Sequence, residues 1–307
     1  MSETLFKKYN VPVPRYTSYP TANSFGPFDE TDYLKAVETS NDATADNISF
    51  YIHVPFCRHL CHYCGCNSVA MAKPDRITEY FETLHKEIDL LLPHLRKDRR
   101  ISQIHYGGGS PSSMPLHFIR SINEHLLSAF ETIDRPEIAI ECHPGYLKEE
   151  DWNYLLDSGF NRFSLGIQDF NDEVLRCVNR QPALLPVETI MKILREGGAK
   201  VNFDFIYGLP KQSVSAFVST IKKAISLRPD RLVTFSYAHL PSLFKRQMIL
   251  EKAGLPSQNE KLNMFEEASK TLQAAGYVPI GMDHFVLPDD DLSVALQHHS
   301  LHRNFQG

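Results

Sequence analysis

The chain alternates between short runs of apolar, β-branched residues and longer amphipathic runs, and this alternation limits its possible folds more than any other feature. Strands separated by helices form a parallel sheet with the helices packed outside it, joined by right-handed crossovers. The sequence therefore predicts an α/β fold, either an open doubly wound sheet or a partial barrel. Six strands are expected, each followed by a helical pattern: Ile48–Val54, Ile101–Tyr106, Ile138–Glu141, Arg162–Ile167, Val201–Tyr207 and Arg231–Tyr237.

The residues on either side of this array predict an arm and an extension. Residues 1–46 include four prolines between positions 12 and 27, which exclude a regular helix there. We expect an irregular N-terminal arm that packs on the surface or covers an active site. Residues 47–240 hold the strand–helix array. Residues 241–307 change pattern, with a helix over 260–274 and a further strand over Tyr277–Phe285. We expect them to be the start of a C-terminal extension that is cut off at Gly307.

The amino-acid composition and net charge argue against several classes of protein. Of 307 residues, 42% are hydrophobic and 22% are charged, as in soluble globular proteins. The formal net charge of −5 gives no basic footprint for nucleic acid. No apolar stretch approaches the roughly 18 residues of a membrane span, and the first eight residues lack the apolar core of a secretory signal. We therefore expect a cytoplasmic protein that binds neither nucleic acid nor membrane.

Four of the six cysteines fall within ten residues, at Cys57, Cys61, Cys64 and Cys66. They follow the first strand, at the end of the sheet where α/β proteins place their active-site loops. Clustering of this kind favours a metal site over a disulfide scaffold. Structural zinc sites usually pair two ligand hooks, and this chain offers one. An electron-transfer cluster is closed by four thiolates, whereas Cys66 stands very near Cys64. Three thiolates would leave one iron open to a small molecule.

The C-x3-C-x2-C spacing in this position resembles the radical S-adenosylmethionine (SAM) superfamily, in which the open iron of a [4Fe–4S] cluster binds SAM. The wider sequence is similar to the oxygen-independent coproporphyrinogen III oxidases. That family implies a partial (β/α)6 radical SAM barrel with an irregular N-terminal arm. The matching segments span nearly the whole chain: Arg15–Thr21, Tyr51–Cys57, Gly65–Asn67, Gly107–Ser112, Gly166–Phe170, Val178–Arg180, Asp204–Pro210, Tyr237–Pro241, Gly281–Phe285 and His302–Gly307.

The resemblance implies a role for each matching position. Cys57, Cys61 and Cys64 would hold the cluster, and Cys66, Arg15 and Tyr16 would act in catalysis, Arg15 by pairing with a substrate propionate. The residues implied to contact SAM are Tyr51, Tyr63, Gly108, Gly109, Ser110, Glu141, Gln168, Arg180, Asp204 and Ala238. The chain departs from the family in three places. Tyr63 stands where phenylalanine is usual, Ser110 and Ser112 stand where threonine is frequent, and His143 stands before Pro144 where an acidic residue is usual.

The implied reaction is the oxidative decarboxylation of two propionates of coproporphyrinogen III, which gives protoporphyrinogen IX and consumes two SAM molecules per macrocycle. An electron donor such as flavodoxin or ferredoxin is expected, and the protein is expected to be a monomer. Two alternatives remain. A haem-chaperone paralogue generally lacks both the Arg15–Thr21 arm and a cysteine at position 66. An anaerobic haem-degrading methyltransferase relative would differ in its products.

Overall fold

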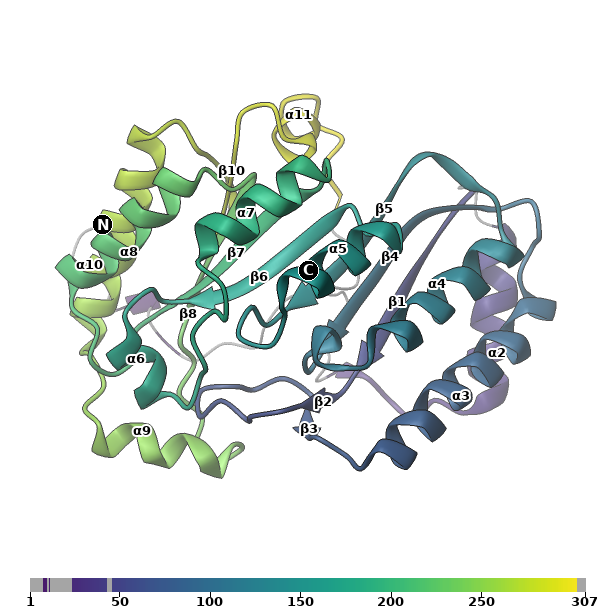
Figure 1. Cartoon of the computed structure of the whole chain (residues 1–307), viewed down its shortest axis with the longest axis horizontal. Helices are drawn as coiled ribbons and strands as arrows, with labels where there is room; N and C mark the ends of the chain where they lie inside the picture. Colours follow the sequence, from purple (N-terminus) through teal and green to yellow (C-terminus); the bar gives the residue numbers. More distant parts are fainter. Residues whose placement is uncertain (1–7, 10, 12–23, 43–45, 303–307) are drawn as a thin grey trace.

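The computed structural model describes residues 8–9, 11, 24–42 and 46–302 (Figure 1). Its centre is an eight-stranded sheet with the order β1-β4-β5-β6-β7-β8-β10-β9, in which the first six strands run parallel. The six-stranded parallel array expected from the sequence is therefore confirmed. The parallel strands are β1 (Asn47–Val54), β4 (Arg100–Gly108), β5 (Thr132–Cys142), β6 (Arg162–Gln168), β7 (Lys200–Tyr207) and β8 (Arg231–Ser236).

Two short strands extend the sheet beyond the parallel array. β10 (His284–Val286) pairs antiparallel with β8, and β9 (Val278–Gly281) pairs antiparallel with β10. The single strand expected over Tyr277–Phe285 is thus a hairpin. Its turn contains Gly281 at φ +143° and Met282 at φ +49°, conformations that end an extended strand. Residues 278–286 therefore belong to the same sheet as the parallel strands, and the expected division into domains stays a prediction.

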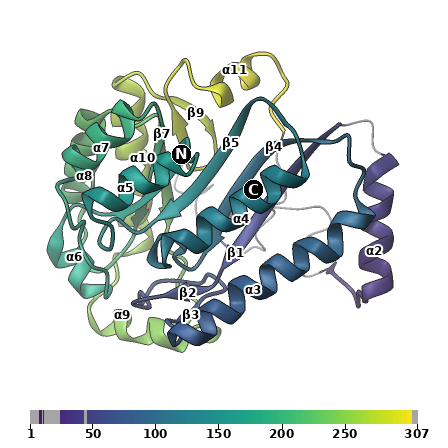
Figure 2. The same cartoon turned by 45° about the vertical axis from the view of Figure 1, so that its right-hand side comes forward.

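Helices pack along the outer face of the sheet, where Figures 1 and 2 show α4, α5 and α7 lying across the strands. A small separate sheet pairs β2 (Phe56–Cys57) with β3 (Val69–Ala70) just after β1. The α-helices are α2 (Glu30–Thr39), α3 (Pro74–Leu91), α4 (Leu116–Ala129), α5 (Glu149–Asp157), α6 (Asp172–Cys177), α7 (Val187–Glu196), α8 (Val214–Leu227), α9 (Met248–Lys252), α10 (Gln258–Ala274) and α11 (Asp291–Gln297). The 3-10 helices are η2 (Ser40–Asp42), η3 (Leu92–His94), η4 (Pro111–Ser113) and η5 (Lys245–Gln247).

The two faces of the parallel strands differ in polarity. On β7, Val201, Phe203 and Phe205 are fully buried against the helices, while Asn202 and Asp204 between them are half-buried on the inner face. A parallel sheet covered by helices on both faces has near-continuous apolar strands. The alternation on β7 therefore leaves the inner face polar, as a ligand site at the strand ends requires.

An ion pair secures the last helix to the sheet. Asp290 is 2% exposed and caps α11, since its Oδ1 accepts a hydrogen bond from the backbone N–H of Leu292 at 2.9 Å. Its carboxylate also accepts from Nε of Arg231 on β8, at 2.9 Å to Oδ2. One buried carboxylate therefore serves both as a helix cap and as the partner of a strand cation.

No helix within the described ranges is long and apolar enough to cross a membrane.

Candidate functional site

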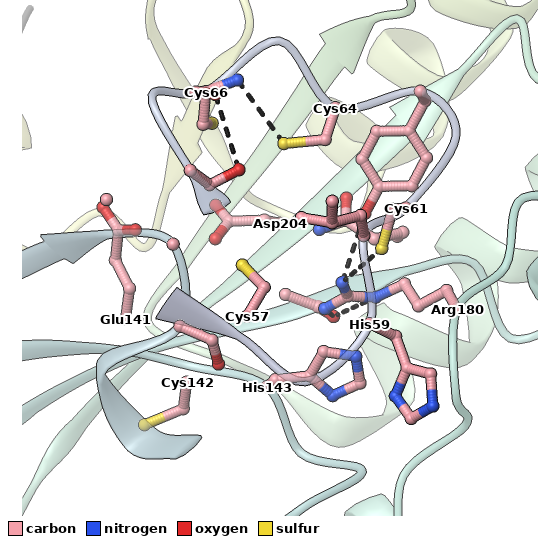
Figure 3. Close-up of a pocket in the computed structure, with 18 of the residues that line it drawn as sticks. Cys57, His59, Cys61, Cys64, Cys66, Glu141, Cys142, His143, Arg180 and Asp204 are labelled. Carbon is pink, nitrogen blue, oxygen red and sulfur yellow. Dashed lines mark hydrogen bonds between the residues drawn. The ribbon is translucent and has the colours of Figure 1, made fainter. Parts of the chain in front are cut away.

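A pocket lies at the carboxyl ends of the parallel strands, next to the segment Cys57–Cys66, which we call the cysteine loop (Figure 3). Most of the residues predicted to bind cluster or SAM line this pocket. They are Cys57, Cys61, Tyr63, Cys64, Gly108, Gly109, Ser110, Glu141, Gln168, Arg180 and Asp204. Cys66, which was predicted to act in catalysis, also lines the pocket. Residues far apart in sequence therefore meet at the edge predicted from the strand–helix alternation.

The cysteine loop is held by bonds to distant parts of the chain. Its start pairs with β3, and the backbone N–H of His62 donates to the carbonyl oxygen of Val178 at 3.0 Å. Nδ2 of Asn179, a residue with φ +57°, donates to the carbonyl oxygen of Leu60 at 3.0 Å. The turn after α6 thus fixes the loop between its first and last cysteines.

All four cysteines of the loop are free thiols, and they differ in exposure. Cys61 is buried, Cys57 and Cys64 are half-buried, and Cys66 is exposed. The sulfur atoms of Cys57, Cys61 and Cys64 face a common space in Figure 3. Within the described part of the chain, no three His, Cys, Asp or Glu side chains form the ligand set of a single metal ion. Thiols spaced around a pocket suit a cluster, because its irons sit at separate corners.

Cys64 and Cys66 are electrostatically distinct. The hydrogen bond from Cys66 lowers the pKa of the Cys64 thiol to about 6, and the nearby positive charge of Arg246 lowers it further. Burial of the Cys64 thiol opposes both effects. The backbone N–H of Cys66 also points at Cys64 Sγ, 3.4 Å away. Although Cys66 is exposed, its pKa is raised, chiefly by its hydrogen bond to the Cys64 thiol. Burial and the neighbouring thiols raise the pKa of Cys57 to about 11. Cys64 is therefore the thiolate of the pair, and Cys66 keeps its proton.

Arg180 places a buried positive charge beside the cluster loop. Its Nη1 donates to Tyr63 Oη at 3.2 Å and lies 3.6 Å from Cys61 Sγ, while Nε donates to the carbonyl oxygen of Gly166 at 3.1 Å. A Cβ at Gly166 would lie 2.6 Å from Arg180 Nη2. Glycine is needed at position 166 because any side chain there would displace the guanidinium.

Asp204 is held by two donors on neighbouring strands. Ser164 Oγ donates to Oδ2 at 2.6 Å, and Asn202 Nδ2 donates to Oδ1 at 2.8 Å. Burial raises the pKa of Asp204 to about 6, with a further contribution from the negative charge of Glu141, although both hydrogen bonds oppose the shift. The carboxylate is therefore fixed in orientation at the base of the pocket.

Gln168 has an unsatisfied acceptor at the pocket. It sits at φ +66° at the end of β6, and its Oε1 is buried with no hydrogen-bond partner among the described residues. A buried polar atom without a partner is costly, so such an atom marks a place where a ligand can bind.

Tyr51 and Ala238 lie beside the pocket rather than in its lining. Tyr51 Oη is 3.1 Å from His53 Nδ1, and burial followed by the Glu141 charge raises the Tyr51 pKa to about 12. The carbonyl oxygen of Ala238 accepts from Gln247 Nε2 at 3.2 Å. Arg15 and Tyr16 fall outside the described residues, so their roles stay predictions.

Sequence reasoning missed several residues that line the pocket or support it. His143 is buried, its ring stacks on Tyr146 with centroids 4.1 Å apart, and its backbone N–H donates to Ser112 Oγ at 3.0 Å. Burial and the Arg180 charge lower the His143 pKa to about 2, so the ring is neutral. The departure at positions 142–144 was the signal for this residue. The others are His59, Leu60, Ser68, Cys142, Tyr146, Ser164 and Gly166 in the lining, with Asn202, Arg246 and Gln247 behind it.

Comparison with known proteins agrees with this geometry. The family model described as the radical SAM superfamily matches residues 51–224, which carry the cysteine loop and most of the sheet. The curated oxygen-independent coproporphyrinogen III oxidase of Helicobacter pylori strain 26695 is 37% identical over 306 residues, covering 98% of this chain and 67% of the relative. The chain belongs to the oxygen-independent coproporphyrinogen III oxidase family of the radical SAM superfamily.

Other members of this family are also similar. The enzymes of that name from Salmonella typhimurium and Escherichia coli are each 42% identical over 305 residues, covering 99% of this chain and 66% of theirs. The solved structure of coproporphyrinogen III oxidase from Escherichia coli, titled a radical SAM enzyme, superposes with a TM-score of 0.90 at 40% identity, covering 99% of this chain and 68% of that one. The chain thus spans about two thirds of the length of the curated relatives it matches.

Proposed function

We propose that this chain forms the radical-generating part of an oxygen-independent coproporphyrinogen III oxidase. The observation that carries the proposal is the meeting of the three thiols of Cys57, Cys61 and Cys64 with Arg180 and Asp204 in one pocket. The curated relatives that carry this name support the choice of coproporphyrinogen III as substrate.

The residues present fit a [4Fe–4S] cluster and SAM. Three thiols face one space, which leaves a fourth iron for the ligand, and Gln168 Oε1 and His143 Nε2 are buried polar atoms without partners among the described residues. When bound, the cluster and SAM together supply one-electron chemistry that can remove a hydrogen atom from an unactivated carbon.

The residues of the pocket would bind SAM and orient it. Arg180 offers a fixed cation to a ligand carboxylate, as guanidinium groups do in paired recognition. Asp204 and Glu141 offer carboxylates to ligand hydroxyl or ammonium groups. The bare backbone of Gly108 and Gly109 allows a ligand to approach the strand end closely. The neutral ring of His143 adds no second positive charge beside Arg180.

Several finer assignments belong to the same proposal. Two SAM molecules are consumed per macrocycle, an electron-transfer protein such as flavodoxin or ferredoxin reduces the cluster, and the protein works as a monomer. Arg15 and Tyr16 act on the substrate from the N-terminal arm. The presence of Cys66 supports the oxidase over the haem-chaperone paralogue.

The deciding experiment is anaerobic reconstitution of iron and sulfide, followed by mass spectrometry of the products formed from coproporphyrinogen III and, separately, from haem. Two successive losses of the mass of formic acid (CO2 and two hydrogens) from coproporphyrinogen are expected. Ring-opened or methylated haem would identify the methyltransferase relative instead. The absence of product from both tetrapyrroles, in protein with a full cluster and SAM cleavage, would contradict the oxidase assignment for this chain.

A further inference from the structure

The segment that follows β8 folds back onto the cysteine loop. Arg246, in η5, donates twice to the carbonyl oxygen of Cys64, from Nε at 3.2 Å and from Nη2 at 2.6 Å. The two residues are 182 positions apart in sequence. A guanidinium forked onto one carbonyl fixes that peptide in direction as well as in distance.

Gln247 continues this contact to the preceding residue of the loop. It is 1% exposed, and its Nε2 donates to the carbonyl oxygens of Tyr63 at 3.0 Å and Ala238 at 3.2 Å. Its Oε1 accepts from the backbone N–H of Leu240 at 2.6 Å. The buried amide therefore ties the cysteine loop to the end of β8 and uses both its donor and its acceptor.

Phe244 completes the contact on the far side of Cys64. A Cβ built on Gly65 would lie 3.2 Å from Phe244 Cε2, so the ring packs directly against the glycine backbone. Three consecutive residues of the loop, Tyr63, Cys64 and Gly65, are thus each contacted by one short segment. The third cysteine of the predicted ligand set lies in the middle of this contact.

We propose that Arg246 and Gln247 are positioning residues that fix Cys64 as a cluster ligand, and that the Arg246 charge raises the cluster's reduction potential. The assignment rests on the proposed function, because it requires a cluster on the three cysteines. A positive charge bonded to the peptide of a ligand stabilises the more negative, reduced state of the cluster. Hydrogen bonding and net charge around the ligands set the potentials of iron–sulfur centres, and groups behind the ligands orient them.

The test separates charge from geometry with four variants. Arg246→Gln removes both, Arg246→Lys keeps the charge without the fork, and Gln247→Ala removes the amide. The control is Lys245→Gln, which removes a charge from the exposed neighbour of Arg246. Each protein is reconstituted anaerobically, and iron content, the midpoint potential from a titration followed by electron paramagnetic resonance, and the rate of iron loss to a chelator are measured.

We expect Arg246→Gln to lower the midpoint potential and to lose iron several-fold faster than wild type. Arg246→Lys should keep the potential but lose iron faster, and Gln247→Ala should do the same. Should Arg246→Gln fail to fold, Arg246→Lys and Gln247→Ala still decide the positioning role, and Arg246→Met, which also removes the charge, decides the charge role by a lower midpoint potential than that of Arg246→Lys. If all three variants match Lys245→Gln in midpoint potential and in the rate of iron loss, the role of Arg246 and Gln247 is wrong, while the proposed function still stands. A wild-type chain that takes up no iron overturns the proposed function and this assignment with it.

Discussion

Arg180 Nη1 lies 3.6 Å from Cys61 Sγ, although 119 residues separate the two in sequence. The other partners of this buried guanidinium are the hydroxyl of Tyr63 and the carbonyl of Gly166, so none of the hydrogen-bond partners found within the described ranges is a carboxylate. A buried cation without an opposite charge is costly, and a ligand carboxylate in the pocket would supply that charge.

Replacing Arg180 should therefore weaken SAM binding. We expect Arg180→Met to raise the Kd of SAM by roughly 10- to 100-fold, because a hydrogen bond to a charged group contributes about 1.5–3 kcal/mol. Arg180→Lys should recover only part of this, since lysine keeps the charge without the fork. Equilibrium dialysis with labelled SAM, alongside iron analysis, gives both quantities. Equal SAM affinity in wild type and Arg180→Met would show that the guanidinium only supports the loop.

The three cluster cysteines should behave alike and differ from Cys66. Replacing Cys57, Cys61 or Cys64 by Ala should abolish the visible absorbance and the bound iron of the reconstituted protein. Cys66→Ala should retain both, because Cys66 is not among the three predicted ligands and its backbone N–H, which points at Cys64 Sγ, remains in the variant. Iron loss in Cys66→Ala as complete as in Cys61→Ala would show that the ligand assignment is wrong.

Asp204 and the residues that hold its carboxylate should contribute to the affinity for SAM, and Asp204 itself should contribute most. Asp204→Ala and Gln168→Ala should weaken SAM binding without loss of iron. Ser164→Ala removes the 2.6 Å bond to Asp204 and the 2.7 Å bond that Ser164 Oγ accepts from Asn202 Nδ2. Because Asn202 still donates to Asp204, the effect on SAM binding should be about 1 kcal/mol, a roughly fivefold rise in Kd. Ser219→Ala, a change on the exposed face of α8, is the matched control. A Ser164→Ala protein that binds SAM as tightly as the control would argue against this positioning.

Asp290 should be needed for stability rather than for binding. Asp290→Ala leaves Arg231 without its partner and removes the cap of α11, which we expect to cost about 3–5 kcal/mol of the free energy of unfolding. The control is Glu267→Ala, which removes a surface ion pair with Lys270 and should change stability by less than about 1 kcal/mol. Urea denaturation of both variants measures the difference. Similar unfolding free energies for the two would refute this role.

A histidine pair between α3 and α4 should make stability depend on pH. His85 Nδ1 is 2.8 Å from His125 Nδ1, and His125 Nε2 is 3.2 Å from Asp89 Oδ1. Burial, followed by the charge of His125, lowers the His85 pKa, while Asp89 acts in the opposite direction.

Since the folded-state pKa of His85 is lowered, the unfolded chain binds more protons below the ordinary histidine pKa of about 6.5. The stability present above that pH should be lost progressively as the pH falls below about 6.5. We expect His85→Asn to reduce this slope in urea titrations, and His117→Asn, at an exposed position on α4, to leave it unchanged. A slope in His85→Asn equal to that of the control would exclude the pair as its source.

The six parallel strands could be predicted because each strand and helix carries its own local periodicity, but this periodicity left the strand order open between a doubly wound sheet and a partial barrel. The position of the cysteine loop followed from it, since strands that run parallel end at one edge. The hairpin of β9 and β10 could not be predicted, because its turn places Met282 at φ +49°, a conformation that methionine does not signal in sequence.

The residues behind the site were harder to predict than those in its lining. Glu141 and Gln168 lie at strand ends, and Asp204 is a carboxylate within strand β7, between two apolar residues, so position alone suggests a role for each. Arg246 and Gln247 lie in the three-residue 3-10 helix η5, which is too short to show a periodicity, and their contacts cross 182 and 184 residues. Such contacts depend on the tertiary structure of the whole chain, so no local sequence pattern predicts them.

The sequence separation between the cysteine loop and the residues that hold it also determines when each contact can form during translation. Asn179 and Arg246 are synthesised 119 and 182 residues after the loop residues they hold. At the usual rates of about 5–20 residues per second, the thiols spend roughly 10–40 s on the ribosome before the last of these partners exists. The cysteine loop therefore lacks these two supports until both residues have been translated. We expect cluster assembly in the finished pocket to follow translation of the sheet.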